Sequence, residues 1–217
     1  MVSDAKSEIL ARIRTALADN PTPPEPTRDY RHTSSASLKD RRELLADRLI
    51  DYKAQVHEAT EDTIATTIAD LLGDRARYVV PTGLKSEWLP EDTATRTRFV
   101  DSGNTEKSGA LSNKELDAMD AVVTSSTVSC AETGTVFLNS NPDEGRRAIS
   151  LIPDHHICVV PEETIVEIVP EALARVDRAH PVTMFSGPSA TSDIELQRVE
   201  GVHGPRRLDV ILLGAKS

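Results

Sequence analysis

Cysteine and aromatic side chains are scarce in this 217-residue sequence, which has two cysteines and 3% aromatic residues. Cys130 and Cys158 are too far apart for a CxxC motif, so we expect free thiols in a reducing compartment. An iron–sulfur cluster usually takes four thiolates, which this chain alone cannot supply. The core must consist of aliphatic side chains, which favours a layered α/β fold over an aromatic-rich β-sandwich.

The sequence also lacks an excess of basic residues and a long apolar run. Its formal net charge is −10 and its pI is about 5.1, which argues against a nucleic-acid or anionic-membrane surface. A locally basic pocket remains compatible with this charge. No window reaches the roughly 18 to 20 apolar residues of a membrane span, and the N-terminus does not resemble a signal peptide. We therefore expect a cytoplasmic protein.

The common sequence motifs of nucleotide, zinc-protease and serine-hydrolase sites are absent: there is no P-loop, GxGxxG, HExxH or GxSxG pattern. His155 and His156 are adjacent, but neighbouring residues of a strand point to opposite faces and cannot easily bind one metal ion. We predict neither a metal site nor a cofactor bound by this chain.

The chain divides into an N-terminal arm, residues 1–37, and a main domain, residues 38–217. Apolar residues at helical spacing predict an amphipathic helix over 4–18, and the proline-rich tract 20–37 reads as a linker. Such an arm is typical of a segment that docks a partner.

The main domain alternates helical and strand patterns. We predict helices over 38–59, 61–72 ending at Gly73, 112–119 with Ser112 and Glu115 as a capping box, and 169–176. Strands are predicted over 77–81, 98–101, 121–126, 147–153, 156–161, 181–187 and 207–213, with strand-like arms around 132–134. The continuous apolar strands indicate an α/β fold whose largely parallel sheet is covered on both faces.

A loop rich in small polar residues follows the predicted strand that ends at Phe185. If that strand belongs to an open α/β sheet, the loop lies beyond its carboxyl end, where ligands bind. Its N–H and hydroxyl groups would form a nest for a carboxylate or phosphate. The alternative is a well-capped turn without a ligand. The candidate residues are Ser186, Gly187, Ser189, Thr191 and Asp193.

Two further segments contain candidate functional residues. In "GVHGPRR", Gly201, Gly204 and Pro205 predict a tight loop with His203 at its tip, and Arg206 follows. The histidine is therefore a candidate acid–base group and Arg206 a candidate carboxylate ligand. The alternative is a surface histidine with paired arginines. In "AETGT", Glu132, with Thr133 and Gly134, is a candidate nucleophile or base, or else the solvated tip of a hairpin.

The pair Arg146 and Arg147 follows the segment "NPDEG". It reads as a turn with a solvated edge, and substrate contact is the less favoured alternative.

Four segments together resemble a known family. "SSTVSCAETGTVFL", "RRAISLIPDHHICVV", "SGPSATSDIELQRVEGVHGP" and "RLDVILL" are similar to the lactate-utilisation protein C family, the LUD domain proteins. The resemblance covers roughly residues 38–214, and the segment 186–205 is its most specific part.

The resemblance implies a three-layer α/β/α fold of the NagB/RpiA and CoA-transferase type. It also implies a cytoplasmic, non-redox subunit that works with iron–sulfur partner proteins to oxidise L-lactate to pyruvate and binds a small carboxylate. By analogy with that superfamily, Glu132 and the segment 186–193 would occupy the acid–base and anion-binding positions. Two alternatives remain open: a stand-alone isomerase- or CoA-transferase-like enzyme that uses Glu132, and a non-enzymatic scaffold.

Overall fold

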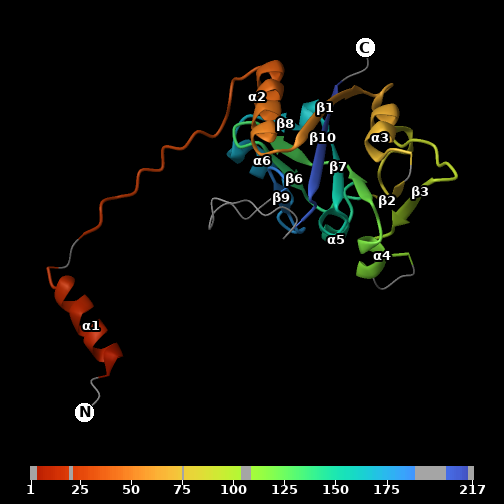
Figure 1. Cartoon of the computed structure of the whole chain (residues 1–217). Coiled ribbons are helices and arrows are strands. Elements are labelled where there is room, and N and C mark those ends of the chain that lie inside the picture. The colour runs from red at the N-terminus through yellow and green to blue at the C-terminus, as the bar shows by residue number, and fades with distance from the viewer. Residues whose placement is uncertain (1–3, 20–21, 75, 104–108, 189–203, 215–217) are drawn as a thin grey trace. The chain divides into compact units, whose positions relative to one another are not determined.

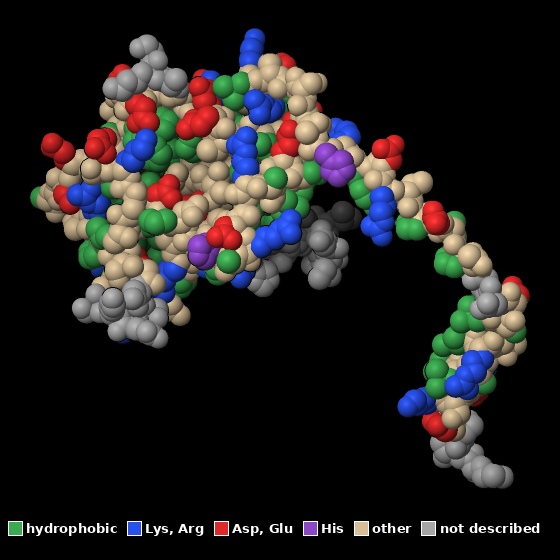
Figure 2. Space-filling model, turned by 180° about the vertical axis from the view of Figure 1, so that it is seen from behind, with side chains coloured by type: hydrophobic (Ala, Val, Ile, Leu, Met, Phe, Trp, Pro, Cys, Tyr) green, Lys and Arg blue, Asp and Glu red, His purple; other side chains and the backbone are tan. Residues whose placement is uncertain are grey.

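The computed structural model describes the chain except for residues 1–3, 20–21, 75, 104–108, 189–203 and 215–217. Met1–Arg31 and His32–Ser217 form separate compact units. The first unit contains helix α1, Ala5–Ala16, which the side chain of Asp4 caps at its N-terminus. Its large hydrophobic side chains are exposed and lie along the helix (Figure 2): Ile9, Leu10, Ile13 and the adjacent Leu17.

The second unit is built on a six-stranded sheet in which every neighbouring pair is parallel (Figure 1). Its order is β1-β10-β7-β4-β2-β3. The strands are β1 (Gln55–Thr60), β10 (Arg207–Gly214), β7 (His155–Pro161), β4 (Ala121–Thr124), β2 (Ala76–Pro81) and β3 (Arg96–Asp101). The predicted α/β fold with a largely parallel sheet is therefore confirmed.

A second, four-stranded sheet has the order β8-β5-β6-β9. It consists of β8 (Ile165–Val166), β5 (Val128–Cys130), β6 (Thr135–Leu138) and β9 (Thr183–Phe185). Strands β5 and β6 pair antiparallel around the tight turn 131–134, as the sequence pattern predicts. Strand β9 also pairs antiparallel with β6, so it does not belong to the parallel sheet.

Helices and the second sheet cover the two faces of the parallel sheet. On one face, α3 (Ile64–Leu72) and η1 (Ser86–Trp88) pack on alternate strand residues such as Val159 and Ile211. The opposite face is covered by α2 (Leu38–Asp51) and the four-stranded sheet, and farther along by α4 (Asn113–Asp117) and α5 (Arg147–Leu151). Helix α6 (Val169–Arg175) packs on β5, and η2 (Glu162–Thr164) follows β7.

The helix predicted over 38–59 is too long, because α2 ends at Asp51 and β1 follows it. A Schellman motif ends the helix: Ala54 N–H donates to Leu49 O and Lys53 N–H to Ile50 O, both at 2.9 Å. Lys53 occupies the left-handed position, with φ 67°, where glycine is usual. Without a glycine, the sequence does not reveal this end.

The strand predicted over 147–153 is also wrong, since α5 occupies Arg147–Leu151. Short apolar runs do not distinguish a strand from a buried helical turn. Ile149 is fully buried against Val79 and Val122, and this packing decides for the helix. Two other predictions are confirmed: the capping box of Ser112 and Glu115 at α4, and Gly73 at the C-terminus of α3.

In the described part of the chain, no helix has the length and apolar character needed to cross a membrane.

Candidate ligand pocket at the carboxyl edge of the sheet

The loop 139–146 lies against the carboxyl ends of β2 and β4. Gly83, just after β2, donates its N–H to Pro142 O at 2.8 Å, and Ser125, just after β4, donates to Asp143 O at 3.0 Å. From β2 the chain runs to β3 at the sheet's edge, whereas from β4 it runs the other way to β7. Ligands of open α/β sheets bind at such a reversal of strand order.

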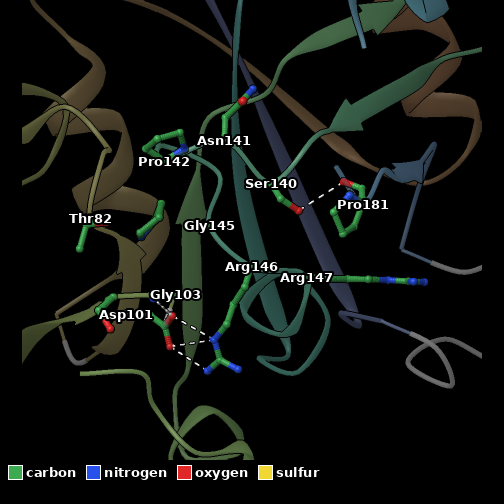
Figure 3. A pocket seen from close by; sticks show the side chains of 12 residues that line it. Thr82, Asp101, Gly103, Ser140, Asn141, Pro142, Gly145, Arg146, Arg147 and Pro181 are labelled. Atoms are coloured by element: carbon green, nitrogen blue, oxygen red, sulfur yellow. Dashed lines mark hydrogen bonds and ion pairs between the residues drawn. The ribbon is translucent and has the colours of Figure 1, made fainter. Parts of the chain in front are cut away.

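A pocket of about 650 Å³ opens at this place (Figure 3). It is bounded by the residues after β2, the residues after β3 and the loop before α5. Its lining consists of Pro81, Thr82, Asp101, Ser102, Gly103, Ser140, Asn141, Pro142, Gly145, Arg146, Arg147 and Pro181. The position and the mixed polar lining make it the leading candidate for a ligand site.

A buried carboxylate holds the loop in place. Glu144 is 1% exposed and accepts hydrogen bonds from the N–H groups of Asn139, at 2.6 Å, and Asn141, at 3.0 Å. Its second oxygen accepts from the Thr127 hydroxyl at 2.5 Å. Burial raises the pKa of Glu144, and these hydrogen bonds offset the rise only in part. Glu144 therefore fixes the backbone that forms the pocket wall.

Backbone contacts leave little freedom at the same wall. A Cβ on Gly83 would lie 2.5 Å from the carbonyl carbon of Pro142, so only glycine permits this approach. Ser140 adopts φ 57°, in the left-handed region that few non-glycine residues use. Strained backbone of this kind persists where the surrounding structure fixes it, here through Glu144.

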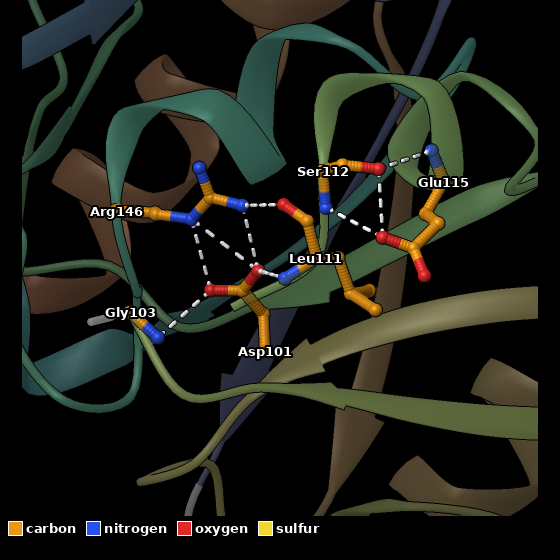
Figure 4. Close-up of polar contacts among 6 residues, drawn as sticks. All are labelled: Asp101, Gly103, Leu111, Ser112, Glu115 and Arg146. Atoms are coloured by element: carbon orange, nitrogen blue, oxygen red, sulfur yellow. Dashed lines mark hydrogen bonds and ion pairs between the residues drawn. The ribbon is translucent and has the colours of Figure 1, made fainter. Parts of the chain in front are cut away.

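Asp101 and Arg146 form an ion pair at the base of the pocket (Figure 4). Asp101 is 1% exposed; Arg146 donates to it from Nε at 3.0 Å and from Nη2 at 2.8 Å. The N–H groups of Gly103 and Leu111 donate to the same carboxylate, each at 2.9 Å. Arg146 also donates to the carbonyl of Leu111. This network joins β3, the segment that follows it and the start of α5.

The electrostatics of the pocket depend on Arg147. Burial opposes ionisation of Asp101, but its hydrogen bonds from Arg146, Leu111 and Gly103 outweigh burial and lower its pKa. Asp101 and Arg146 thus neutralise each other. Arg147 is exposed, its guanidinium forms no hydrogen bond or ion pair with any described residue, and in Figure 3 its side chain extends away from that pair. It gives the lining a net positive charge.

The predicted residues Glu132, Thr133 and Gly134 lie on the turn between β5 and β6, away from this pocket's lining. Glu132 is exposed at the turn, which matches the hairpin-tip alternative, and its N–H donates to Glu167 O at 2.9 Å. Gly134 has φ 63° and packs against α2, where a Cβ would lie 2.6 Å from that of Arg48.

Ser186 and Gly187 lie beside this turn. The hydroxyls of Ser186 and Thr135 are 3.0 Å apart, and a Cβ on Gly187 would lie 2.3 Å from Tyr52 O, just after α2. The structure therefore brings these two predicted segments together. The argument that Ser186 follows a strand of the parallel sheet is wrong, however, because β9 belongs to the four-stranded sheet. Ser189, Thr191, Asp193 and His203 lie outside the described residues.

Gly204 and Arg206 lie just before β10, at the amino edge of the parallel sheet. Arg206 forms an ion pair with Asp154, which precedes β7, and both side chains are more than half exposed. This is the paired-arginine alternative that the sequence left open. Gly204 approaches Leu151 at the end of α5. None of the described residues predicted as a site lines the carboxyl-edge pocket.

Substrate contact was the less favoured prediction for Arg147, which the pocket lining makes the leading candidate for a binding residue. The signal was the "NPDEGRR" turn with two consecutive arginines. This pair was predicted to form a turn with a solvated edge, because the sequence alone does not show that the turn borders a pocket. For metals, the described residues contain no group of three or more histidine, cysteine, aspartate or glutamate side chains placed to hold an ion.

Comparison with known proteins places this architecture in a family. The LUD domain model matches residues 42–213, and the chain belongs to the LUD domain family. Lactate utilization protein C of Deinococcus radiodurans is 43% identical over 216 residues, covering 98% of this chain and 97% of the relative. Lactate utilization protein C of Bacillus subtilis is 34% identical over 143 residues, covering 60% and 57%.

A crystal structure with the same fold is that of a DUF162 family protein from Deinococcus radiodurans. It is 36% identical in sequence and superposes with a TM-score of 0.67. The match covers 83% of this chain and 100% of that one.

Proposed function

We propose that this protein acts in lactate utilisation and binds a small 2-hydroxy or 2-oxo acid in the carboxyl-edge pocket, with Arg147 as the carboxylate ligand. The names of the relatives support the pathway. The observation that carries the binding proposal is the exposed Arg147, which has no ionic partner among the described residues, in a pocket where Asp101 already neutralises Arg146.

The chemistry of the lining fits such a ligand. The planar guanidinium of arginine can donate two parallel hydrogen bonds to a carboxylate. The Thr82 and Ser140 side chains line the same pocket and can contact a 2-hydroxyl or 2-oxo group. A lactate molecule fills only part of about 650 Å³, so the pocket has room for a second reactant or for a contribution from a partner.

The Arg147→Gln substitution tests this proposal. In the wild-type chain, L-lactate or pyruvate at a hundredfold excess over Kd is expected to raise the free energy of unfolding by about 2.7 kcal/mol. Arg147→Gln is expected to abolish most of this gain, because it removes the charge and the forked donor. Denaturant unfolding with and without ligand measures the effect at about pH 8, above the range in which histidine side chains ordinarily change charge.

Two matched substitutions interpret the result. Arg28→Gln removes the same charge from the N-terminal unit and should leave the ligand effect intact. Arg206→Gln removes the arginine that the sequence predicted as the ligand. If Arg206→Gln rather than Arg147→Gln removed the effect, the ligand would bind at the amino edge and the pocket assignment would be wrong. Without stabilisation of the wild type, direct binding of these acids would be rejected.

For the redox step we propose a cytoplasmic assembly in which an iron–sulfur partner protein accepts the electrons. Conversion of lactate to pyruvate releases two electrons and two protons, which an acceptor must take. The chain has two cysteines, both buried, against the four thiolates that a cluster usually takes. The tagged chain, captured from lactate-grown cells of its own source, should carry broad visible iron–sulfur absorbance. Capture with no such absorbance at any salt concentration would contradict the assembly.

A further inference from the structure

A second polar cluster lies at the amino edge of the parallel sheet, centred on Asp209 of β10. Asp209 is 0% exposed, and its two oxygens each accept from a histidine Nε2 at 2.6 Å: Oδ1 from His57 of β1 and Oδ2 from His155 of β7. Arg207 of β10 donates its Nε–H to Oδ2, also at 2.6 Å. Three neighbouring strands thus converge on one buried carboxylate.

The carboxylate fixes the protonation pattern of both imidazoles. Burial works against ionisation of Asp209, but the hydrogen bonds from His155, Arg207 and His57 outweigh it and lower its pKa to about 2. An ionised carboxylate only accepts hydrogen bonds, so each histidine must carry a proton on Nε2. The remaining ring nitrogen, Nδ1, is then the atom at which each histidine gains or loses a proton.

Both Nδ1 atoms are available to a ligand. No described residue forms a hydrogen bond with either, and neither is among the buried polar atoms that lack a partner. The side chains of His57 and His155 are 29% and 12% exposed, and that of Arg207 is 45% exposed. The cluster is therefore held by the buried Asp209, while parts of its histidine and arginine side chains are accessible to solvent.

The charge of the cluster depends on those two atoms. The charges of Arg207 and Asp209, both on β10, cancel each other. The charges of Asp154, just before β7, and Arg206, just before β10, also cancel. With neutral imidazoles these groups together carry no net charge, and Nδ1 is an acceptor. Each imidazole that is protonated adds one positive charge and turns Nδ1 into a donor. His156 does not contribute, because it points to the other face, where burial lowers its pKa to about 3.

We propose that this amino-edge cluster binds an oxyanion group, a phosphate or a carboxylate, through His57, His155 and Arg207, and that binding takes up protons at the two Nδ1 atoms. Two Nδ1–H groups and the exposed guanidinium would then face the anion, while Asp209 positions the imidazoles from behind. The site lies at the opposite edge of the sheet from the pocket of Arg147 and does not depend on the function proposed for that pocket.

Calorimetric titration of the Arg147→Gln chain tests the proposal without interference from the carboxyl-edge pocket. Inorganic phosphate and pyruvate are titrated separately at about pH 6 and about pH 8, the range in which histidine side chains change charge. At least one of the two anions is expected to bind at the lower pH and to lose about tenfold or more in affinity at the higher one. Repeating the titration in buffers of different ionisation enthalpy should reveal proton uptake. Tighter binding of inorganic phosphate would identify the ligand group as a phosphate, and tighter binding of pyruvate would identify it as a carboxylate.

Substitution of both histidines decides whether they form the site. His57→Gln with His155→Gln keeps a side-chain amide that can donate to Asp209, so the fold is preserved, but it removes the titrating atoms. Binding at about pH 6 should then be lost. His180→Gln, which removes an exposed imidazole paired with Asp177, is the matched control and should not change binding. Affinity that is equal at both pH values, unaffected by the double substitution, or undetectable for both anions would overturn the proposal.

Discussion

Replacing Asp101 by alanine is expected to lower the free energy of unfolding by about 3–5 kcal/mol, the range found when one partner of a buried ion pair is removed. The substitution leaves the Arg146 guanidinium, whose side chain is 20% exposed, without its counter-ion. It also removes the acceptor for the N–H groups of Gly103 and Leu111. Urea denaturation monitored by circular dichroism measures the change.

A control and a double substitution separate the ion pair from general effects. Asp117→Ala removes an exposed carboxylate on α4 and should change stability by no more than about 0.5 kcal/mol. The pair Asp101→Ala with Arg146→Met should cost less than the sum of the two single changes, because no unpaired charge remains. A strictly additive result would show that the two side chains do not act as a unit.

The pH dependence of the Asp101 contribution has a defined sign. Its pKa is lowered in the folded state, so the folded protein binds fewer protons there than the unfolded chain does. The stabilisation is fully present above the unfolded pKa of about 3.9 and is lost as the pH falls toward the lower folded value. The stability difference between wild type and Asp101→Ala should therefore shrink in acid.

Glu144→Ala is the second substitution with a large expected effect, a loss of about 3 kcal/mol or more. It removes the acceptor for the N–H groups of Asn139 and Asn141 and for the Thr127 hydroxyl, and unsatisfied buried groups cost about 1–3 kcal/mol each. Because this carboxylate holds the pocket loop, ligand stabilisation through Arg147 should fall as well. Denaturant unfolding with and without L-lactate measures both effects.

The contribution of Glu144 to the free energy of unfolding should change with pH in the opposite direction from that of Asp101, and Glu144→Gln tests this. Burial raises the pKa of Glu144, so the folded state holds this proton more tightly than the unfolded chain. The wild type thus loses stability as the pH rises from the unfolded pKa of about 4.3 toward the raised folded value. Glutamine cannot ionise, so the stability of Glu144→Gln relative to wild type should improve over that window. A difference that stays constant with pH would contradict this assignment.

Much of the sheet could be predicted from short stretches of sequence. The strands β2, β4, β7 and β10 are continuous apolar runs, which is how strands buried on both faces read. The capping box of Ser112 and Glu115 was enough to predict the start of α4. The glycine at 134 was enough to predict the turn between β5 and β6. These features depend on residues within a few positions of one another, so local patterns are enough to determine them.

The errors arose where a local signal was missing or ambiguous. At the end of α2, Lys53 occupies the left-handed position where a glycine is usual. The predicted helix therefore extends to residue 59 and includes most of β1. The segment Arg147–Leu151 is apolar enough to form either a strand or a helix. Packing of Ile149 against the parallel sheet stabilises the helix. Strand β9 looked like a member of the parallel sheet, although its partner is β6.

By itself, the sequence determined the α/β class, the apolar strands and the chemistry available to a site. Only the tertiary structure decided which charged groups meet. It pairs Arg146 with Asp101, 45 positions away, and leaves the Arg147 guanidinium without an ionic partner among the described residues; it brings His57 to Asp209 across 152 positions. The reason is physical: strand order and register arise from packing between distant segments, and they decide whether a charge is buried with a partner or exposed without one.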